Sequence, residues 1–205
     1  MTVPKYWKQA KIFLSKKDKV LKKLINKYKG SLKTRKDPFF SLCKSIIGQQ
    51  ISVQAASSVW IKLEKKAKKI NPININKLNK RQLSSCGLSR QKIRYLKIIA
   101  KKFITKELDI KKIKKMSDKD AIKCLTEVKG IGIWTAEMFL FFNFMRPNIF
   151  PIQDIGLLRG ISINYKTKYP PSALQLKKFQ NKWSPYCTVA TWYLWRSIDP
   201  EPVSY

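Results

Sequence analysis

The sequence contains no histidine, and this absence narrows the chemistry that the chain can carry out. Histidine is the commonest general base near neutral pH, and it activates the nucleophile in Ser–His and Cys–His pairs. Those mechanisms are excluded here. Any acid–base step must use one of the 12 Asp and Glu residues, a lysine or a tyrosine.

Cysteine is scarce and scattered, which argues against a metal centre built on thiolates. The four cysteines are Cys43, Cys86, Cys124 and Cys187, and no two of them form a C-x-x-C pair. Without histidine as a second ligand type, this spacing predicts neither a structural zinc site nor an iron–sulfur cluster. We expect four free thiols in the protein interior.

Long apolar segments are also missing. The sequence has no run of 18 apolar residues, so we expect no membrane-spanning helix and no membrane partner. The start of the chain, MTVPKYWKQAKIFLSKK, does not resemble a signal peptide with a cleavage site. These features favour an intracellular protein, and we expect it in the cytoplasm or nucleoid of a prokaryote.

What the sequence has in excess is positive charge. Lys and Arg number 44, so the net charge is +32 and the pI is about 10.2. Such an imbalance predicts binding to a polyanion, which could be DNA, RNA or an anionic membrane surface. The 205 residues suit one large domain or two small lobes that share a cleft.

The apolar residues recur mostly with helical spacing, and no segment alternates with a period of two. This pattern predicts an all-α protein of about ten short helices. A second helix is expected to start at Ser15. Other predicted helix N-caps are Asp37 before Pro38, Ser52, Ser89 and Ser117.

Two glycines separate two apolar helical runs in the stretch LTEVKGIGIWTAEMFLFF, residues 125–142. Gly130 and Gly132 permit a tight turn and leave backbone N–H groups uncovered beside the start of the next helix. Lys129 adds positive charge, and Ile131 can point inward. The turn therefore predicts a binding site for a nucleic-acid phosphate. The alternative is a plain turn between helices.

Asp154 is the carboxylate that stands out before any comparison. In the stretch between Arg146 and Arg159 it is the only charged residue, and its neighbours are mostly apolar. A carboxylate in such surroundings is either a helix N-cap or a functional group. The two interpretations are compatible, because an N-cap aspartate can face a cleft.

Four motifs, in this order, resemble the DNA-3-methyladenine glycosylase II family of helix–hairpin–helix (HhH-GPD) DNA glycosylases. They are FFSLCKSIIGQQISVQAA, GIGIWTAEMFLFF, NIFPIQDIGLLRGI and WSPYCTVATWYLWR. The resemblance covers about residues 5–198. It implies one HhH-GPD domain over residues 1–205, with two helical lobes around a cleft. The interior lobe would span about 38–150, and both termini would form the other. It also implies monofunctional base release from alkylated duplex DNA, without a required cofactor.

The resemblance also implies roles for individual residues. Asp154 would be the catalytic aspartate, which stabilises positive charge on the sugar as the base departs. Trp134, Met138 and Trp195 would line the base pocket, and the two tryptophans could equally be ordinary core residues. Some relatives have a lysine in place of Trp134 and also cut the DNA backbone. Because this chain lacks that lysine, we expect no lyase step.

Further residues are assigned to DNA by the same resemblance. Gln50, with Ile51 beside it, would enter the duplex as a wedge when the base is flipped out. The alternative is a loop after a helix, in which Gln49 hydrogen-bonds to backbone groups. Lys129, Gly130, Ile131 and Gly132 would contact a phosphate through the hairpin.

Two more expectations come from this family pattern. The backbone carbonyls of Thr126, Val128 and Ile131 could hold a structural monovalent cation. Cys187 stands where the family commonly has an arginine, so an ion pair or a DNA contact could be lost there.

Two other functions stay open at this level. The chain could be a non-catalytic helix–hairpin–helix protein that binds DNA, or a glycosylase for an oxidised or deaminated base. In each case the expected partner is double-stranded DNA, which for the enzymes contains damaged bases, and the expected oligomeric state is a monomer.

Overall fold

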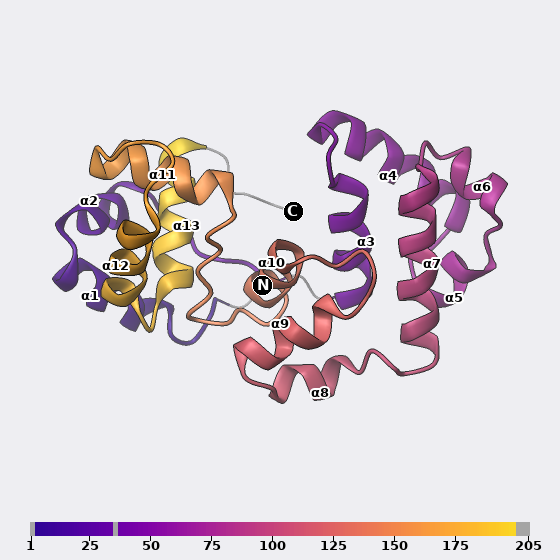
Figure 1. The fold of residues 1–205 in the computed structure, drawn as a ribbon, viewed down its shortest axis with the longest axis horizontal. Coiled ribbons are helices and arrows are strands. Elements are labelled where there is room, and N and C mark those ends of the chain that lie inside the picture. Colours follow the sequence, from indigo (N-terminus) through magenta and orange to yellow (C-terminus); the bar gives the residue numbers. More distant parts are fainter. Residues whose placement is uncertain (1–2, 35–36, 200–205) are drawn as a thin grey trace. The chain divides into compact units, whose positions relative to one another are not determined.

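The computed structural model describes residues 3–34 and 37–199, and every regular element in these ranges is a helix (Figure 1). The predicted all-α class is therefore confirmed. The described residues form 13 helices rather than about ten, because three short helices of five or six residues, α5 (Pro72–Lys77), α6 (Lys80–Ser84) and α8 (Ile110–Lys115), add to the longer ones. No described helix is long and apolar enough to cross a bilayer.

The chain divides into two compact units. Of the described residues, 3–34 and 140–199 form the first, which we call the terminal unit, and 37–139 form the second, the interior unit. The terminal unit contains α1 (Trp7–Lys17), α2 (Lys19–Lys27), α11 (Ile155–Tyr165), α12 (Ala173–Trp183) and α13 (Cys187–Ile198). The interior unit contains α3 (Pro38–Gly48), α4 (Val53–Ala67), α5 (Pro72–Lys77), α6 (Lys80–Ser84), α7 (Arg90–Ile104), α8 (Ile110–Lys115) and α9 (Asp118–Thr126). The helix α10 (Ile133–Phe142) begins in the interior unit and ends in the terminal unit.

The terminal unit is built around α13, which contacts α1, α2, α11 and α12. In Figure 1 the first helices of the chain, in indigo, lie beside the last ones, in orange and yellow. Aromatic residues join these distant segments: the Trp7 ring meets the edge of the Trp192 ring at a centroid distance of 5.3 Å. Burial of such large side chains contributes most of the stabilising free energy of a small core.

The interior unit is organised by α7, which contacts α3, α5 and α6. Phe39 and Phe40, at the start of α3, point in two directions. Phe39 packs edge-on against Phe103 of α7, and Phe40 packs in the same way against Trp60 of α4. The adjacent aromatic pair therefore fixes α3 between two neighbouring helices.

Most of the predicted helix starts are confirmed. The side chains of Asp37, Ser52, Ser89 and Ser117 each accept a hydrogen bond from a backbone N–H in the first turn of the helix that follows. The predicted start at Ser15 is wrong. Because the first helix continues to Lys17, Asp18 is the residue that caps α2.

The buried side chain of Asp18 connects the start of α2 to the end of α12 through hydrogen bonds and an ion pair. Its Oδ1 accepts hydrogen bonds from the N–H groups of Val20 and Leu21, and its Oδ2 accepts one from Trp183 Nε1 at 3.1 Å. Lys182 Nζ lies 2.8 Å from the same Oδ2. Burial alone would raise the pKa of Asp18, but these donors outweigh it and hold the pKa below its usual value.

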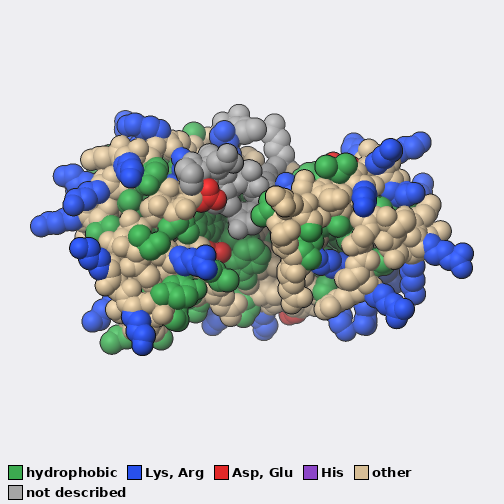
Figure 2. Space-filling model, turned by 90° about the horizontal axis from the view of Figure 1, so that it is seen from above, with side chains coloured by type: hydrophobic (Ala, Val, Ile, Leu, Met, Phe, Trp, Pro, Cys, Tyr) green, Lys and Arg blue, Asp and Glu red, His purple; other side chains and the backbone are tan. Residues whose placement is uncertain are grey.

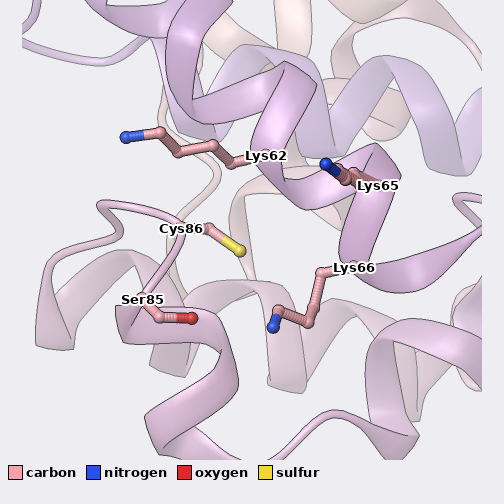
Figure 3. A pocket seen from close by; sticks show the side chains of 5 residues that line it. All are labelled: Lys62, Lys65, Lys66, Ser85 and Cys86. Carbon is pink, nitrogen blue, oxygen red and sulfur yellow. The ribbon is translucent and has the colours of Figure 1, made fainter.

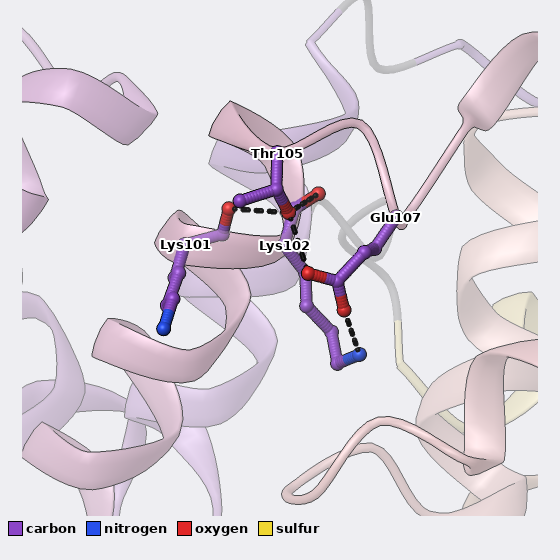
Figure 4. Close-up of polar contacts among 4 residues, drawn as sticks. All are labelled: Lys101, Lys102, Thr105 and Glu107. Atoms are coloured by element: carbon purple, nitrogen blue, oxygen red, sulfur yellow. Dashed lines mark hydrogen bonds and ion pairs between the residues drawn. The ribbon is translucent and has the colours of Figure 1, made fainter.

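Basic side chains cover much of the surface, and Figure 2 shows Lys and Arg spread over the visible face with few acidic groups among them. One of the ion pairs in the described residues lies where α7 ends (Figure 4). Lys102 Nζ and Glu107 Oε2 are 2.8 Å apart, and Thr105 Oγ1 donates to Glu107 Oε1. The pair links the last turn of α7 to the segment that leads to α8. Because the pair is exposed, it adds little stability.

Replacing Asp18 with alanine should destabilise the terminal unit by about 3 kcal/mol, because a helix cap and two charged hydrogen bonds are lost. Urea unfolding followed by tryptophan fluorescence measures this. The matched control is Asp109→Ala, which removes an exposed cap on α8 and should cost about 1 kcal/mol.

The Asp18 contribution should also depend on pH. Since the folded-state pKa is lowered, the stabilisation is complete above the unfolded pKa of about 4 and is lost as the pH falls through the folded value. A difference between wild type and Asp18→Ala that stays constant from neutral pH down to about pH 2 would contradict this assignment.

Candidate functional site

The hairpin between α9 and α10 is held by hydrogen bonds of its own backbone. The N–H of Ile131 donates to the carbonyl of Val128 at 2.9 Å, and the N–H of Ala136 donates to the carbonyl of Gly132 at 2.9 Å. Lys129 and Gly132 are exposed, whereas the Ile131 side chain is buried. The surface of the turn is therefore formed by Lys129 and the glycines, and the buried side chain of Ile131 holds the turn against the core.

The two glycines of the hairpin meet different requirements. Gly130 has a φ of +103°, and a Cβ at this position would lie within 2.8 Å of three side-chain atoms of Tyr95 in α7. Gly132 has no atom within 4 Å of where its Cβ would be. Gly130 is thus required by packing and backbone conformation, while Gly132 leaves the outer surface of the turn open.

The segment between α3 and α4, residues 49–52, forms an exposed loop. Gln50 is exposed and has a φ of +57°, a left-handed conformation that non-glycine residues rarely adopt. Ile51 is 40% exposed, and Val53, the first residue of α4, is 86% exposed. Val53 had no distinguishing signal in the sequence, since an apolar residue at the start of a helix is usually part of the core.

Gln49 makes the kind of contact that the alternative interpretation of this loop proposed. Its Nε2 donates to the carbonyl of Gly130 at 3.2 Å and to Thr135 Oγ1 at 3.5 Å. The loop is therefore tied to the hairpin within the interior unit. The wedge role of Gln50 and Ile51 stays a prediction, and both side chains are accessible for it.

The helix α10 carries two of the residues assigned to the base pocket. Trp134 is partly exposed, and Met138 is buried one turn later on the same face. Between them in the sequence lies Glu137, a buried acidic residue that the sequence analysis does not single out. An acidic residue inside the apolar helix IWTAEMFLFF was the available signal.

Asp154 lies in the terminal unit, where it is the N-cap of α11. The residue is 6% exposed, and its Oδ1 accepts hydrogen bonds from the N–H of Leu157 at 2.7 Å and from Trp195 Nε1 at 2.7 Å. The N-terminus of α11 adds the positive end of the helix dipole. These groups stabilise a negative charge that burial alone would disfavour.

Trp195 orients this carboxylate from α13. The residue is buried, and its ring lies against the rings of Phe141 and Phe142 at centroid distances of 4.8 Å and 6.0 Å. The Phe142 and Trp195 rings are nearly parallel, with an angle of 9°. This packing fixes the indole N–H toward Asp154, a contact that helical periodicity alone does not reveal.

Two glycines let α11 approach α13 closely enough for that contact. A Cβ at Gly156 would lie 3.0 Å from Trp195 Cδ1 and 3.1 Å from Asp154 Oδ1. A Cβ at Gly160 would lie 3.0 Å from the carbonyl oxygen of Leu194. The spacing of four residues places both glycines on the face of α11 that meets α13.

Cys187, which stands in place of a common arginine, is buried at the start of α13. Burial raises the pKa of its thiol to about 12, so the thiol is neutral. Cys43 and Cys86 are also buried, Cys124 is partly exposed, and all four thiols are free. Within residues 3–34 and 37–199 no cluster of three Cys, Asp or Glu residues is arranged to hold a metal.

A basic pocket of about 540 Å³ lies elsewhere in the interior unit (Figure 3). Lys62, Lys65 and Lys66 line it from α4, and Ser85 and Cys86 line it from the end of α6. The lining contains three ammonium groups and no carboxylate, so the pocket adds to the positive potential of this unit.

Comparison with known protein families agrees with this arrangement. Residues 43–185 match the model of the HhH-GPD superfamily of base excision DNA repair proteins. The turn with two glycines between α9 and α10, followed by a buried N-cap aspartate, is thus found in a chain that belongs to this superfamily.

Solved structures share the fold. The DNA-3-methyladenine glycosidase of Bacillus halodurans is 31% identical with a TM-score of 0.80, over 91% of this chain and 87% of that one. The 3-methyladenine DNA glycosylase Mag1 of Schizosaccharomyces pombe, solved with abasic DNA, is 27% identical with a TM-score of 0.80, over 92% and 96%. A relative found by its sequence is the DNA-3-methyladenine glycosylase of Bacillus subtilis. It is 32% identical over 79% of this chain, and the matched region covers 57% of the length of that relative.

The two hairpin glycines should respond differently to alanine. Gly130→Ala should lower stability by more than about 1 kcal/mol, because it combines a left-handed backbone with a clash against Tyr95.

Gly132→Ala should unfold at the wild-type temperature. If the turn holds a phosphate, Gly132→Ala should nonetheless weaken binding to duplex DNA in a fluorescence anisotropy titration. Wild-type affinity for Gly132→Ala would argue against phosphate binding at the hairpin.

Proposed function

We propose that this protein is a monofunctional DNA glycosylase of the DNA-3-methyladenine glycosylase II type, which hydrolyses the N-glycosidic bond of alkylated bases in duplex DNA. The observation that carries the proposal is the buried Asp154 carboxylate, oriented by two N–H donors at the start of a helix. The names of the similar proteins from Bacillus halodurans and Schizosaccharomyces pombe support the same substrate class.

The carboxylate acts on the sugar. As the bond between sugar and base breaks, the sugar becomes an oxocarbenium-like cation, and a nearby negative charge lowers the energy of that state. Surroundings from which water is largely excluded strengthen the interaction. Asp154 can also orient or deprotonate the attacking water. A base that already carries a positive charge leaves readily without a general acid, which suits a chain without histidine.

The reaction stops after base release. A lyase step needs an amine that forms a Schiff base with the sugar, and Trp134 occupies the position of that lysine in the bifunctional relatives. Of the three residues assigned to the base pocket, Trp134 is the one that is partly exposed, and its role would be to stack on a cationic base. Met138 and Trp195 are buried, and Trp195 also acts through its hydrogen bond to Asp154.

DNA is held by backbone and charge. Lys129 and the uncovered turn at Gly132 bind a phosphate, while Gln50 and Ile51 fill the gap left by the flipped base.

Backbone carbonyls are ligands that suit an alkali cation, and those of Thr126, Val128 and Ile131 would hold it. The carbonyl of Val128 already accepts the Ile131 N–H, so it has one acceptor position left for an ion. The protein acts as a monomer inside a prokaryotic cell.

Asp154→Asn should abolish base release while DNA is still bound. Asparagine keeps the N-cap and the shape of the side chain but removes the charge, so excision should fall by at least about 10²-fold. Release of methylated bases from alkylated duplex DNA measures activity, and anisotropy measures binding. The matched control, Asp109→Asn, changes an exposed N-cap of α8 and should be fully active. Near-wild-type excision by Asp154→Asn would refute the role. If wild type released no alkylated, deaminated or oxidised base, a binding module would be favoured.

Trp195→Phe should reduce excision through the loss of one donor to the carboxylate. A hydrogen bond to a charged group contributes about 1.5–3 kcal/mol, which corresponds to about 10- to 150-fold in rate. Single-turnover kinetics are the measurement. Trp192→Phe is the control, since Trp192 is a buried tryptophan of the same helix that packs against Trp7 instead of contacting Asp154. An equal loss in both variants would mean that Trp195 acts only through packing.

A further inference from the structure

The exposed loop between α3 and α4 and the hairpin between α9 and α10 are joined by one side chain. The amide of Gln49 reaches across 81 positions of sequence to the Gly130 carbonyl and also contacts Thr135 in the first turn of α10. Thr135 is buried, so this end of the connection is fixed by packing. The two hydrogens of the Gln49 amide match two oxygen acceptors.

The helix α7 supports both segments from one face. Lys92 Nζ donates to the carbonyl of Ile47 at 2.7 Å, near the end of α3 and directly before the loop. Tyr95, three residues later, lies under Gly130 and accepts a hydrogen bond from Gln91 Nε2 at 2.6 Å. Residues three apart share a helix face. The loop and the hairpin therefore rest on the same short stretch of α7.

The backbone of the loop needs such support. Gln50 holds a left-handed conformation, which costs a non-glycine residue about 1 kcal/mol and persists when its surroundings determine it. Gln49 precedes it directly. Its hydrogen bond to Gly130 fixes the residue on one side of the strained position, and the cap of α4 by Ser52 fixes the other side.

We propose that Gln49 is a positioning residue that locks the loop at residues 50–53 to the hairpin, so that both act on DNA as one rigid body. The inference rests on the proposed function. Extruding a base from the duplex costs a few kcal/mol, and a loop can push against the duplex only if it is braced. The hairpin supplies that brace, because it holds a phosphate at a fixed distance from the wedge.

The lock is tested first in the free protein, by amide hydrogen exchange. Gln49→Leu removes the donor at similar volume, and Gln49→Glu replaces it with an acceptor that faces two oxygens. Both should speed exchange at residues 50–52 and at 128–132, with exchange across α7 unchanged. Gln54→Glu, at an exposed glutamine in the first turn of α4, is the control for added negative charge. Unchanged exchange in the Gln49 variants would overturn the lock, whether or not the protein releases bases.

The functional consequence is tested by placing one alkylated base either in a normal pair or in a single-nucleotide bulge. The bulge already lowers the cost of unstacking, so it needs less of the wedge. Gln49→Leu should slow single-turnover excision from the paired site by about tenfold and from the bulge by less than about threefold. An equal loss on both substrates would overturn the positioning role. A wild type inactive on both would refute the proposed function instead, and the exchange result would still decide whether the lock exists.

Discussion

The constraint on which the terminal unit depends is the placement of a carboxylate in apolar surroundings. Asp154 can be 6% exposed because the first turn of α11 and the indole of Trp195 both donate to it. That arrangement brings the backbone of α11 at Gly156 and Gly160 so near to Trp195 and Leu194 of α13 that a Cβ at either glycine would lie about 3.0 Å from them. The position of one charged group thus sets the contact between two helices, and α13 in turn organises the rest of the unit.

The scarcity of acidic residues determines where they are used. Asp18, Asp37, Asp109 and Asp154 each cap the N-terminus of a helix and accept backbone N–H groups. At these positions a carboxylate satisfies donors that would otherwise lack a partner and meets the positive end of the helix dipole. Lysine and arginine outnumber the acidic residues on the surface. A strongly positive field and well-capped helices are therefore compatible in one small chain.

Local features could be predicted from the sequence, whereas contacts between distant segments could not. The caps at Asp37, Ser52, Ser89 and Ser117 follow from residue type and position. The second helix begins after Asp18 and not at the predicted Ser15, and the Asp18 carboxylate also accepts a hydrogen bond from Trp183, 165 positions away, which no local pattern reveals.

The same limit applies to the site. That Asp154 caps a helix was readable, but its hydrogen bond to Trp195 spans 41 positions and depends on helix packing. The sequence is compatible with Gln49 as a donor to backbone groups, but it does not identify the partner, Gly130, which lies 81 positions away. A single sequence carries the composition of such a site without its geometry.

The division of the chain has a consequence for biosynthesis. The first 34 residues belong to a unit whose other half begins only at Leu140. During synthesis on the ribosome, α1 and α2 therefore emerge well before α12 and α13, the helices that they contact in the finished protein. The segment between them in the sequence can complete its own core first. Trp7 packs against Trp192 and Tyr193 in the finished protein, so it lacks these partners for that interval, in which incomplete folding units are open to chaperones and proteases.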